Sequence, residues 1–558
     1  MINFVQKNPI ITILYLIYLI VGLFVVDNFG VGIEEHFQRS SGFFWLKHLL
    51  SFTNFEVLKS IVDQKIIDIY QFSPQLPSVN LAYYYGIIFD LPMAYLESIF
   101  NIKSSQNYFY LRHVSSFLIF FISGVFFYKI IKIRTSNNII SFFGSAMYLL
   151  APKAFGNSFF DGKDLFFLSV LTITIYYYIS YEKKKNLSSL IIFSIFASFA
   201  TSSRIFGLMI PVCFFLVTIL ELVNSSNNQK YIFKKLVVFY FVYIISLHLH
   251  WPYMWSFNFS HIWPFELIDL KNFFAPFKVH GTYKVFFNGQ YFESNFLPIN
   301  YLPKWILIST PIYFLMLFFI GYIFYLKRIF LRFLHLKKIS INNDLWKGSN
   351  EKCDLINFLC FFQVIAVYFT FNMNFIKGWT HFIFLNFFLI YFSTIGIYIL
   401  FLIVRKNKKF IIGICLAFIL FTSELIYKLT IYHPYQYLYL NNFVIKKDRS
   451  KYEADYQSLS RTDAIKDIIN DSKKNNIIVA TASWTPFENG ASLISNKKKK
   501  INFIGTANKE KADYIYTNYF YEIDIRYNRK YDIPKNFILF KTLYIDGIKV
   551  YSIYKKKF

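Results

Sequence analysis

The sequence predicts a polytopic α-helical membrane protein with a small α/β domain at its C-terminal end. Hydrophobic residues make up 55% of its 558 residues, whereas charged residues make up only 16%, and the mean hydropathy is +0.39. A water-soluble protein of this length could not cover so much apolar surface with so few charges. The apolar residues also occur in blocks of roughly 17–25, which is the length of helix that crosses a bilayer.

The apolar blocks predict about eleven transmembrane helices. They lie near residues 8–26, 109–131, 138–155, 162–181, 188–203, 205–223, 233–248, 304–325, 355–373, 381–403 and 410–430. The fifth and sixth blocks are short and are joined by Thr201-Ser202-Ser203-Arg204, which indicates a broken or re-entrant pair of helices. No small-residue cleavage site follows the first block, so we expect an uncleaved first span.

Five clusters of basic residues between the blocks predict the orientation of the chain. The clusters are Lys129/Lys132/Arg134, Lys183/Lys184/Lys185, Lys230/Lys234/Lys235, Lys327/Arg328/Arg332/Lys337/Lys338 and Arg405/Lys406/Lys408/Lys409. They occupy alternate loops, and all of them fall on the cytoplasmic side if the N-terminus is cytoplasmic. An odd number of spans then puts the C-terminal domain outside the cytoplasm. We therefore expect a multi-pass protein of the bacterial inner (plasma) membrane.

The chain divides into a membrane-embedded part, residues 1–445, and a soluble extracytoplasmic α/β domain, residues 446–558. Under the predicted orientation, residues 27–108 and 249–303 form two long extracytoplasmic loops. Both loops are rich in Trp, Tyr and Pro, and they hold most of the acidic residues of interest.

The pattern of the C-terminal domain predicts one helix followed by several strands. Ser460, with Asp463 three residues later, predicts a capping box that opens the helix. Short β-branched runs predict strands, and Asp546-Gly547 predicts the turn of a closing hairpin. We find no Gly-rich phosphate loop and no Cys/His metal spacing in this sequence, so we assign the domain no chemistry of its own.

Two adjacent carboxylates, Glu34 and Glu35, follow directly on the first span, with Arg39 nearby. One carboxylate could accept a proton from an attacking hydroxyl, while the other orients that hydroxyl or binds a metal. The alternative interpretation is a solvated loop in which two acids happen to be neighbours.

A second polar cluster follows the third span, in the segment from Lys153 to Asp161, Lys163 and Asp164. The predicted orientation puts it on the same outer side as Glu34. Its lysines could hold a phosphate-bearing substrate, and its acids could position a sugar. The alternative is a charged turn between two spans.

Three further ionisable residues lie near the outer ends of spans: Arg112 and His113 in the second span, and Arg204 between the two short helices. Ionisable groups in such places are candidates for function. The alternative is that the arginines only extend their charged groups to the membrane surface.

The order and sidedness of these residues resemble the C-type glycosyltransferase superfamily. The nearest relatives are bacterial enzymes similar to protein O-mannosyltransferases and to the lipid A aminoarabinose transferase. IEEHFQR resembles the family's acidic first-loop motif, with Glu34 where aspartate is usual, and GNSFFDGKDLFF resembles the second-loop motif. WPYMW, NGQYFESNFLPINYLPKWILISTP, GWTHF and YHPYQYLYLNNF match later stretches of one bacterial branch. In GWTHF, Thr380 stands where arginine is frequent.

The resemblance implies an inverting glycosyltransferase that moves a sugar from a polyprenyl-phosphate donor to an extracytoplasmic acceptor hydroxyl. Glu34 would deprotonate that hydroxyl, with Glu35 and Asp164 as the other catalytic acids. The candidate substrate-binding residues are Arg39, Arg112, His113, Lys163, Arg204, Lys377 and His381. If the missing arginine at position 380 normally grips the donor phosphate, Lys377 or Arg204 must take its place.

The implied partners are the lipid-linked donor, membrane lipid, and a glycan, lipid or protein acceptor. We expect no cofactor, and a divalent metal held by Glu34 and Asp164 is the less favoured alternative. The net charge of +27 lies mostly in the basic loop clusters, so we expect no nucleic-acid partner.

Two other classes of function stay open at this point. A transporter should show ionisable residues at mid-span and an inverted repeat of broken helices, whereas a flippase of lipid-linked glycans would share the substrate class and the outer basic groups. A catalytically degenerate membrane scaffold is the second alternative, and the threonine at position 380 would favour it.

A reporter fused after Phe558 tests the predicted topology. A reporter that is active only outside the cytoplasm should give signal there, because the five basic clusters are predicted on the opposite side. The same reporter fused after Arg405 should stay silent, which controls for expression. The reverse pattern would put the candidate site residues in the cytoplasm.

Overall fold

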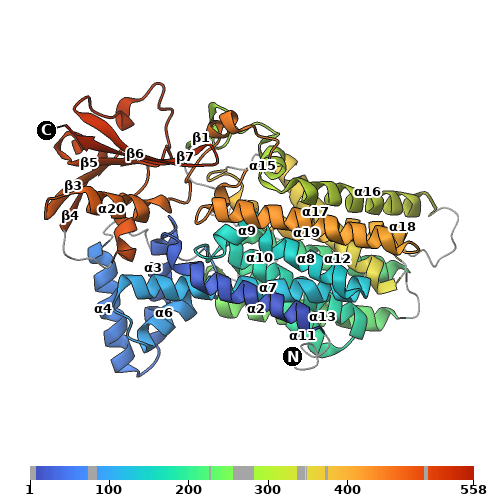
Figure 1. The fold of residues 1–558 in the computed structure, drawn as a ribbon. Helices are drawn as coiled ribbons and strands as arrows, with labels where there is room; N and C mark the ends of the chain where they lie inside the picture. Colours follow the sequence, from blue (N-terminus) through green and yellow to red (C-terminus); the bar gives the residue numbers. More distant parts are fainter. Residues whose placement is uncertain are drawn as a thin grey trace.

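The computed structural model describes residues 8–72, 84–224, 228–255, 282–335, 346, 348–370, 375–494 and 500–557. Long helices run side by side in one bundle, and a β-sheet formed by the C-terminal region lies at one end of it (Figure 1). The polytopic helical fold with a small α/β region at its C-terminal end is therefore confirmed.

Nine helices of the described residues are long and apolar enough to cross a membrane. Their bounds are α2 Pro9–Val25, α7 Ser105–Thr135, α10 Asp164–Lys184, α12 Met209–Asn224, α13 Gln229–His250, α16 Ile312–His335, α17 Gly348–Thr370, α18 Leu385–Val404 and α19 Lys408–Ile431. Two shorter apolar helices, α8 Asn138–Leu150 and α11 Leu187–Ser203, accompany them. Each predicted span overlaps one of these helices.

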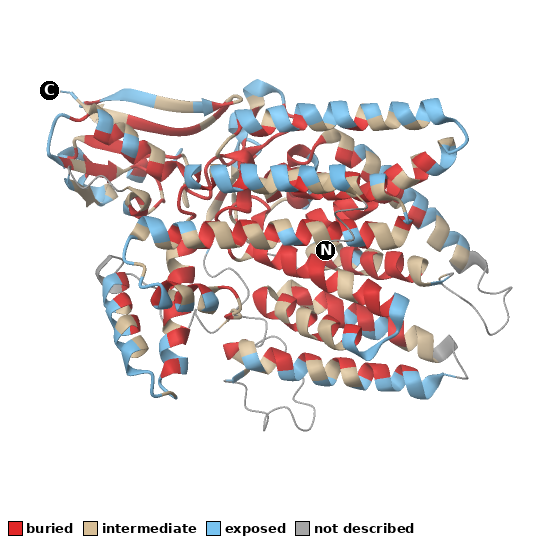
Figure 2. Ribbon diagram, turned by 60° about the horizontal axis from the view of Figure 1, so that its bottom comes forward, coloured by how far each residue is buried: buried red, intermediate tan, exposed pale blue. Residues whose placement is uncertain are grey.

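Buried positions concentrate on the helices in the middle of the bundle (Figure 2). Within the most apolar window of each helix, 83% of α10 and 72% of α18 are buried, against 11% of α19 and 17% of α2. The exposed residues of the outer helices include large apolar side chains such as Phe24, Phe410 and Leu420. Such apolar faces match a lipid environment, because exposing so much apolar surface to water costs free energy.

Two breaks interrupt the helices near the sheet end of the bundle. The predicted span 304–325 is two helices, α15 Tyr301–Ser309 and α16, because Pro311 follows an extended Thr310. The predicted break at Arg204 is confirmed, since this residue is extended between α11 and the 3-10 turn η2 Ile205–Leu208.

Three helices of the first long loop pack together at the same end as the sheet (Figure 1). They are α3 Glu35–Leu50, α4 Glu56–Phe72 and α6 Asp90–Ile99, and they share a small apolar core that includes Phe43, Leu46 and Val62. Gly42 lets α3 approach α6, because a Cβ there would lie 2.3 Å from the backbone oxygen of Asp90. This contact orients the helix that begins at Glu35. Residues 73–83 of the loop, like residues 256–281 of the second predicted loop, lie outside the described part of the chain.

The C-terminal region forms a five-stranded sheet with the order β4-β3-β5-β7-β6. Its strands are β3 Asn476–Thr481, β4 Lys500–Ile504, β5 Tyr514–Thr517, β6 Phe537–Ile545 and β7 Ile548–Lys556. The strands β3, β4 and β5 run parallel, and β7 pairs antiparallel with both β5 and β6. The predicted hairpin turn is confirmed, since Asp546 and Gly547 both have positive φ, at 48° and 84°.

The predicted capping box is wrong, although its helix, α20 Ser460–Asp471, is present. The Ser460 hydroxyl donates to Asp455 instead of accepting from the first turn of α20, and Asp463 accepts from Tyr435. These longer-range partners lie in the segment before the helix, so the local capping pattern could not reveal them.

The C-terminal region shares one apolar core with the helical bundle. Residues of β3, β5 and β7 belong to the same buried cluster as the central helices. The fully buried Arg461 donates to the backbone oxygen of Val31 at 2.6 Å, and Ile33 donates its N–H to the oxygen of Gln457 at 3.0 Å. The sheet region therefore fixes the loop that follows the first span.

Buried ion pairs join the end of α7, the end of α10 and the beginning of α17. Asp354 accepts from Arg134 at 2.7 Å and from Arg328 at 3.2 Å. Lys352, two residues earlier, pairs with Glu182 and Glu221.

Two more basic clusters join the same network. Lys185 also pairs with Glu182, and Lys235 also pairs with Glu221. The contacts thus bring four of the five basic clusters to one end of the bundle. Their cytoplasmic location stays a prediction.

Asp354→Asn should lower the free energy of unfolding by about 3–5 kcal/mol. Asp354 is only 2% exposed, and its replacement leaves Arg134 and Arg328 without this counter-charge. Chemical unfolding of the detergent-solubilised protein measures this loss. The exposed pair Asp448–Lys451 provides the control, and Asp448→Asn should leave the free energy of unfolding nearly unchanged. Equal losses for the two variants would show that the buried network does not stabilise the bundle.

Candidate functional site

Four segments that are distant in sequence meet at the sheet end of the bundle. They are the loop before α3, the loop before α10, the break at Arg204, and the segment from Lys377 to His381. A small cavity joins three of them and is lined by residues that include Glu34, Asp164 and His381. We call Glu34, Asp161, Lys163, Asp164, Arg204, Lys377 and His381 the polar cluster.

Glu34 and Lys377 form the first ion pair of the polar cluster. The side chain of Glu34 is 34% exposed, while that of Lys377 is almost fully buried. Lys377 and Gly378 both have positive φ, at 63° and 60°. A lysine in this left-handed conformation is strained, and the surrounding structure must hold it there.

Glu453 binds the backbone of the strained Lys377-Gly378 pair. Its carboxylate accepts the N–H of Gly378 and the N–H of Phe286, both at 3.3 Å. Burial raises the pKa of Glu453 to about 7. Since Glu453 lies between α19 and α20, the segment before the sheet region positions Lys377.

Asp164 forms the second ion pair, with Arg204 at 2.5 Å. His381 Nδ1 lies 3.2 Å from the other oxygen of Asp164 and 3.4 Å from Arg204 Nη2. Asp164 is the first residue of α10, and Arg204 is the extended residue between α11 and η2. The helix break therefore delivers a guanidinium group to the start of α10.

Asp161 accepts the backbone N–H groups of Lys163 and Asp164, at 3.1 Å and 2.8 Å, and so satisfies the first turn of α10. Burial, and then the charge of Asp164, raise the pKa of Asp161 to about 7. Within the described residues, its Oδ2 atom and Arg204 Nε are buried without a hydrogen-bond partner. Buried polar atoms of this kind can be paired by a water molecule or by a polar ligand.

Lys163 lies over the ring of Tyr85, with its ammonium nitrogen 3.1 Å from the ring centroid. Arg204 approaches the same ring at 5.6 Å. The charge of Lys163 lowers the pKa of the Tyr85 hydroxyl. The aromatic ring thus stabilises two cations of the polar cluster.

Glu34 is ionised at neutral pH. Burial by itself raises the pKa of this carboxyl, but Lys377, Lys163, Arg204 and His381 together hold it well below its usual range. The loop after the first span thus carries a carboxylate that is surrounded by cations.

The structure puts Glu35, Arg112 and His113 beside the polar cluster. Glu35 accepts the N–H of Gly32 at 2.6 Å, and His113 Nε2 lies 3.1 Å from the Glu35 carboxylate. Arg112 pairs with Asp90 at 2.6 Å.

Arg39 is the one candidate residue that the structure does not bring to the polar cluster. It makes a bidentate pair with Glu97, at 2.6 Å and 3.0 Å, and stacks on Tyr108. Its charge is therefore used to hold α3 against α6 and the start of α7.

The sequence patterns named neither Tyr85 nor Glu453. Tyr85 lies in a run of aromatic residues, and Glu453 lies in a segment without any motif. Only their long-range contacts with Lys163 and Gly378 distinguish them.

The cavity inside the polar cluster has a volume of about 20 Å³, enough for about one water molecule. A larger ligand therefore requires the ion pairs to open. No group of three or more His, Cys, Asp and Glu side chains that could hold a metal occurs among the residues described. Glu34 and Asp164 line the same small cavity, and each is paired with a cation.

No model of a known protein family matches the sequence, and no curated protein matches it significantly. Among solved structures, the chain is similar to ArnT from Cupriavidus metallidurans bound to undecaprenyl phosphate, with 8% identity, a TM-score of 0.44 and 98% of each chain covered. It is also similar to the apo state of that ArnT, with 9% identity, a TM-score of 0.44 and 97% of each chain covered.

Proposed function

We propose that the protein is an inverting glycosyltransferase that moves a sugar from a polyprenyl-phosphate donor to a hydroxyl group of an acceptor. One observation carries the proposal: an ionised, partly exposed carboxylate, Glu34, follows the first span and is surrounded by cationic side chains. The reaction needs a base for the acceptor hydroxyl and positive charge for the departing phosphate. The polar cluster offers both.

Three side chains of the polar cluster are suited to bind the donor phosphate. Lys163, Arg204 and Lys377 can each make charge-assisted hydrogen bonds to phosphate oxygens. Arg204 also has a buried Nε that lacks a partner in the described structure. The cluster lies at the ends of α10 and α11, so the lipid tail of a bound donor can stay among the helices.

Donor binding would also activate the base. Lys377 now neutralises Glu34, which makes this carboxylate a weak proton acceptor. A phosphate that draws the Lys377 ammonium toward itself releases Glu34, and the loss of this partner raises the pKa of the carboxyl. The base then becomes competent only when the donor is present.

The chemical step is a single displacement at the anomeric carbon of the sugar. Glu34 takes the proton of the acceptor hydroxyl, and the oxygen of that hydroxyl forms the new bond to the anomeric carbon. The bond between that carbon and the phosphate oxygen breaks, and its electron pair leaves with the polyprenyl phosphate. Lys163, Arg204 and Lys377 stabilise the charge that develops on this leaving group. Attack from the opposite face inverts the configuration.

The threonine at position 380 does not deprive the polar cluster of a guanidinium group. Thr380 lines the same cavity as Glu34 and Asp164, and Arg204 reaches Asp164 at 2.5 Å. Arg204 therefore supplies from the helix break the charge that an arginine at position 380 would supply. This arrangement favours an active enzyme over a degenerate scaffold.

Glu34→Gln should reduce turnover by about 10²–10⁴-fold, because it removes the positioned general base. Donor binding should persist, since Lys377 loses its competing partner and all cations remain. Turnover is measured with a radiolabelled polyprenyl-phosphate sugar in membranes, and donor binding is measured separately by filter retention.

Glu56→Gln on the exposed part of α4 is the matched control and should leave turnover unchanged. Glu34→Asp should retain activity, because it restores the residue that the resembled family uses. If Glu34→Gln turns over like the unmodified protein, the mechanism fails, and a flippase of lipid-linked glycans becomes the better account.

Lys377→Met should shift the acidic limb of the kcat/KM profile to higher pH. The ammonium group is the main attraction that lowers the pKa of Glu34, so its loss raises that pKa, and the base becomes protonated at a higher pH. The donor KM should also rise roughly ten-fold, on the scale of one charged hydrogen bond. Lys377→Arg should keep the limb in place, and an unmoved limb in Lys377→Met would contradict the pairing of these residues.

A further inference from the structure

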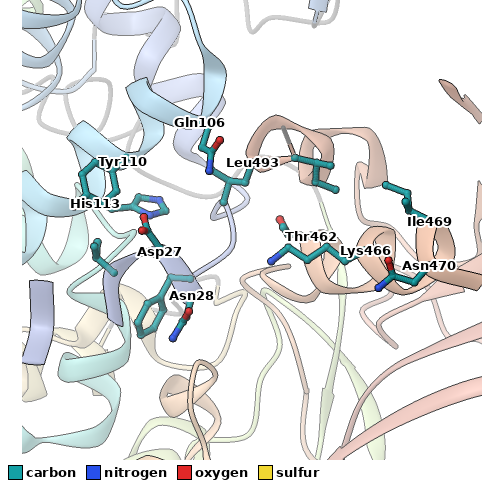
Figure 3. A pocket seen from close by; sticks show the side chains of 13 residues that line it. Asp27, Asn28, Gln106, Tyr110, His113, Thr462, Lys466, Ile469, Asn470 and Leu493 are labelled. Atoms are coloured by element: carbon teal, nitrogen blue, oxygen red, sulfur yellow. The ribbon is translucent and has the colours of Figure 1, made fainter. Parts of the chain in front are cut away.

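A second cavity lies between the helical bundle and the C-terminal region, with a volume of about 360 Å³. Side chains of the first loop and of α7, including Asp27 and Gln106, meet side chains of α20 such as Asn470 across it (Figure 3). The size lies in the range of small-ligand pockets. The residues of the polar cluster do not line this cavity.

The lining of this cavity is polar but close to neutral. Asp27 contributes one carboxylate and Lys466 one ammonium, which pairs with Asp463 at 3.6 Å. The other polar groups include the side-chain amides of Gln106 and Asn470. Lys163, Arg204 and Lys377 of the polar cluster do not line this cavity.

The groups of this cavity match the surface of a sugar. Each amide and each hydroxyl can both donate and accept hydrogen bonds, as sugar hydroxyls do, and a carboxylate accepts two of them. Tyr110 lines the same cavity with a ring that is 42% exposed, and such a ring can pack against the C–H face of a pyranose. No arginine lines the cavity, so the bidentate group that phosphate recognition favours is missing from the described lining.

One hydrogen-bonded pair separates this cavity from the polar cluster. His113 lines the larger cavity, Glu35 lines the small cavity beside Glu34, and the two side chains are 3.1 Å apart. A ligand that displaces or rotates this pair would extend from the neutral cavity to the base.

We propose that the larger cavity is the acceptor site and that it accepts an uncharged saccharide. The acceptor role rests on the proposed glycosyltransferase function, whereas the saccharide site itself does not. The two sites differ in charge as their ligands do. The lysines and the arginine of the polar cluster bind the donor phosphate, and the nearly neutral cavity binds a sugar whose hydroxyl is to be glycosylated. Anionic acceptors are disfavoured by the exposed Asp27.

Cysteine protection in the full-length protein, reconstituted in nanodiscs, tests the saccharide site. Asn470→Cys reports on the cavity, and Lys473→Cys, which is exposed on the same segment outside the cavity, is the matched control. The unmodified protein gives the background from its own cysteines. The probes are neutral trisaccharides of glucose, galactose, mannose and N-acetylglucosamine, with glucose 1-phosphate for comparison.

At least one neutral trisaccharide should slow maleimide labelling at position 470 by about three-fold or more, while labelling at position 473 stays unchanged. Asp27→Ala in the reporter background should remove the protection. If no neutral trisaccharide protects, or if glucose 1-phosphate protects equally well, the proposed site is wrong.

The acceptor role has its own readout. With the protecting saccharide as acceptor, Tyr110→Ala should raise the acceptor KM and leave the donor KM unchanged. A raised donor KM instead would contradict the assignment of this cavity. If protection occurs but Glu34→Gln does not slow transfer, the saccharide site stands while the proposed catalytic mechanism fails.

Discussion

The ion pair between Glu34 and Lys377 joins two loops that lie 343 residues apart in sequence, and the geometry of the polar cluster depends on it. One segment before the sheet region holds both loops: Gln457 and Arg461 bind the backbone of the first loop, and Glu453 binds Gly378. The C-terminal region therefore fixes the backbone of the two loops that carry Glu34 and Lys377.

Buried charges gather at both ends of the bundle. At the far end, Asp354 pairs with Arg134 and Arg328, and Glu182 pairs with Lys352 while its Oε1 atom keeps no hydrogen-bond partner in the described structure. At the sheet end, Arg204 and Asp161 also keep unpaired polar atoms within the described structure, and there a small cavity adjoins them. A buried pair is costly to break, because the remaining partner is left as an unpaired charge.

The sequence could predict the fold because membrane spans depend on local composition, which the apolar blocks record directly. It could also predict most of the polar cluster, because the predicted topology put Glu34, Lys163 and Asp164 on the same side of the membrane as Arg204. It could not predict that Arg39 pairs with Glu97, or that Glu453 supports Gly378, because these contacts link distant segments that carry no motif. The capping box is wrong for a local reason, since the Ser460 hydroxyl donates to Asp455, five residues earlier.

The most direct test of the account is a cryo-electron microscopy structure of the protein with a bound polyprenyl-phosphate sugar. The account predicts that the donor phosphate lies within hydrogen-bond distance of Lys377 and Arg204, and that Lys377 no longer contacts Glu34. The carboxylate of Glu34 should then face the anomeric carbon on the side opposite the phosphate. A phosphate bound elsewhere, with the Glu34–Lys377 pair intact, would contradict the account.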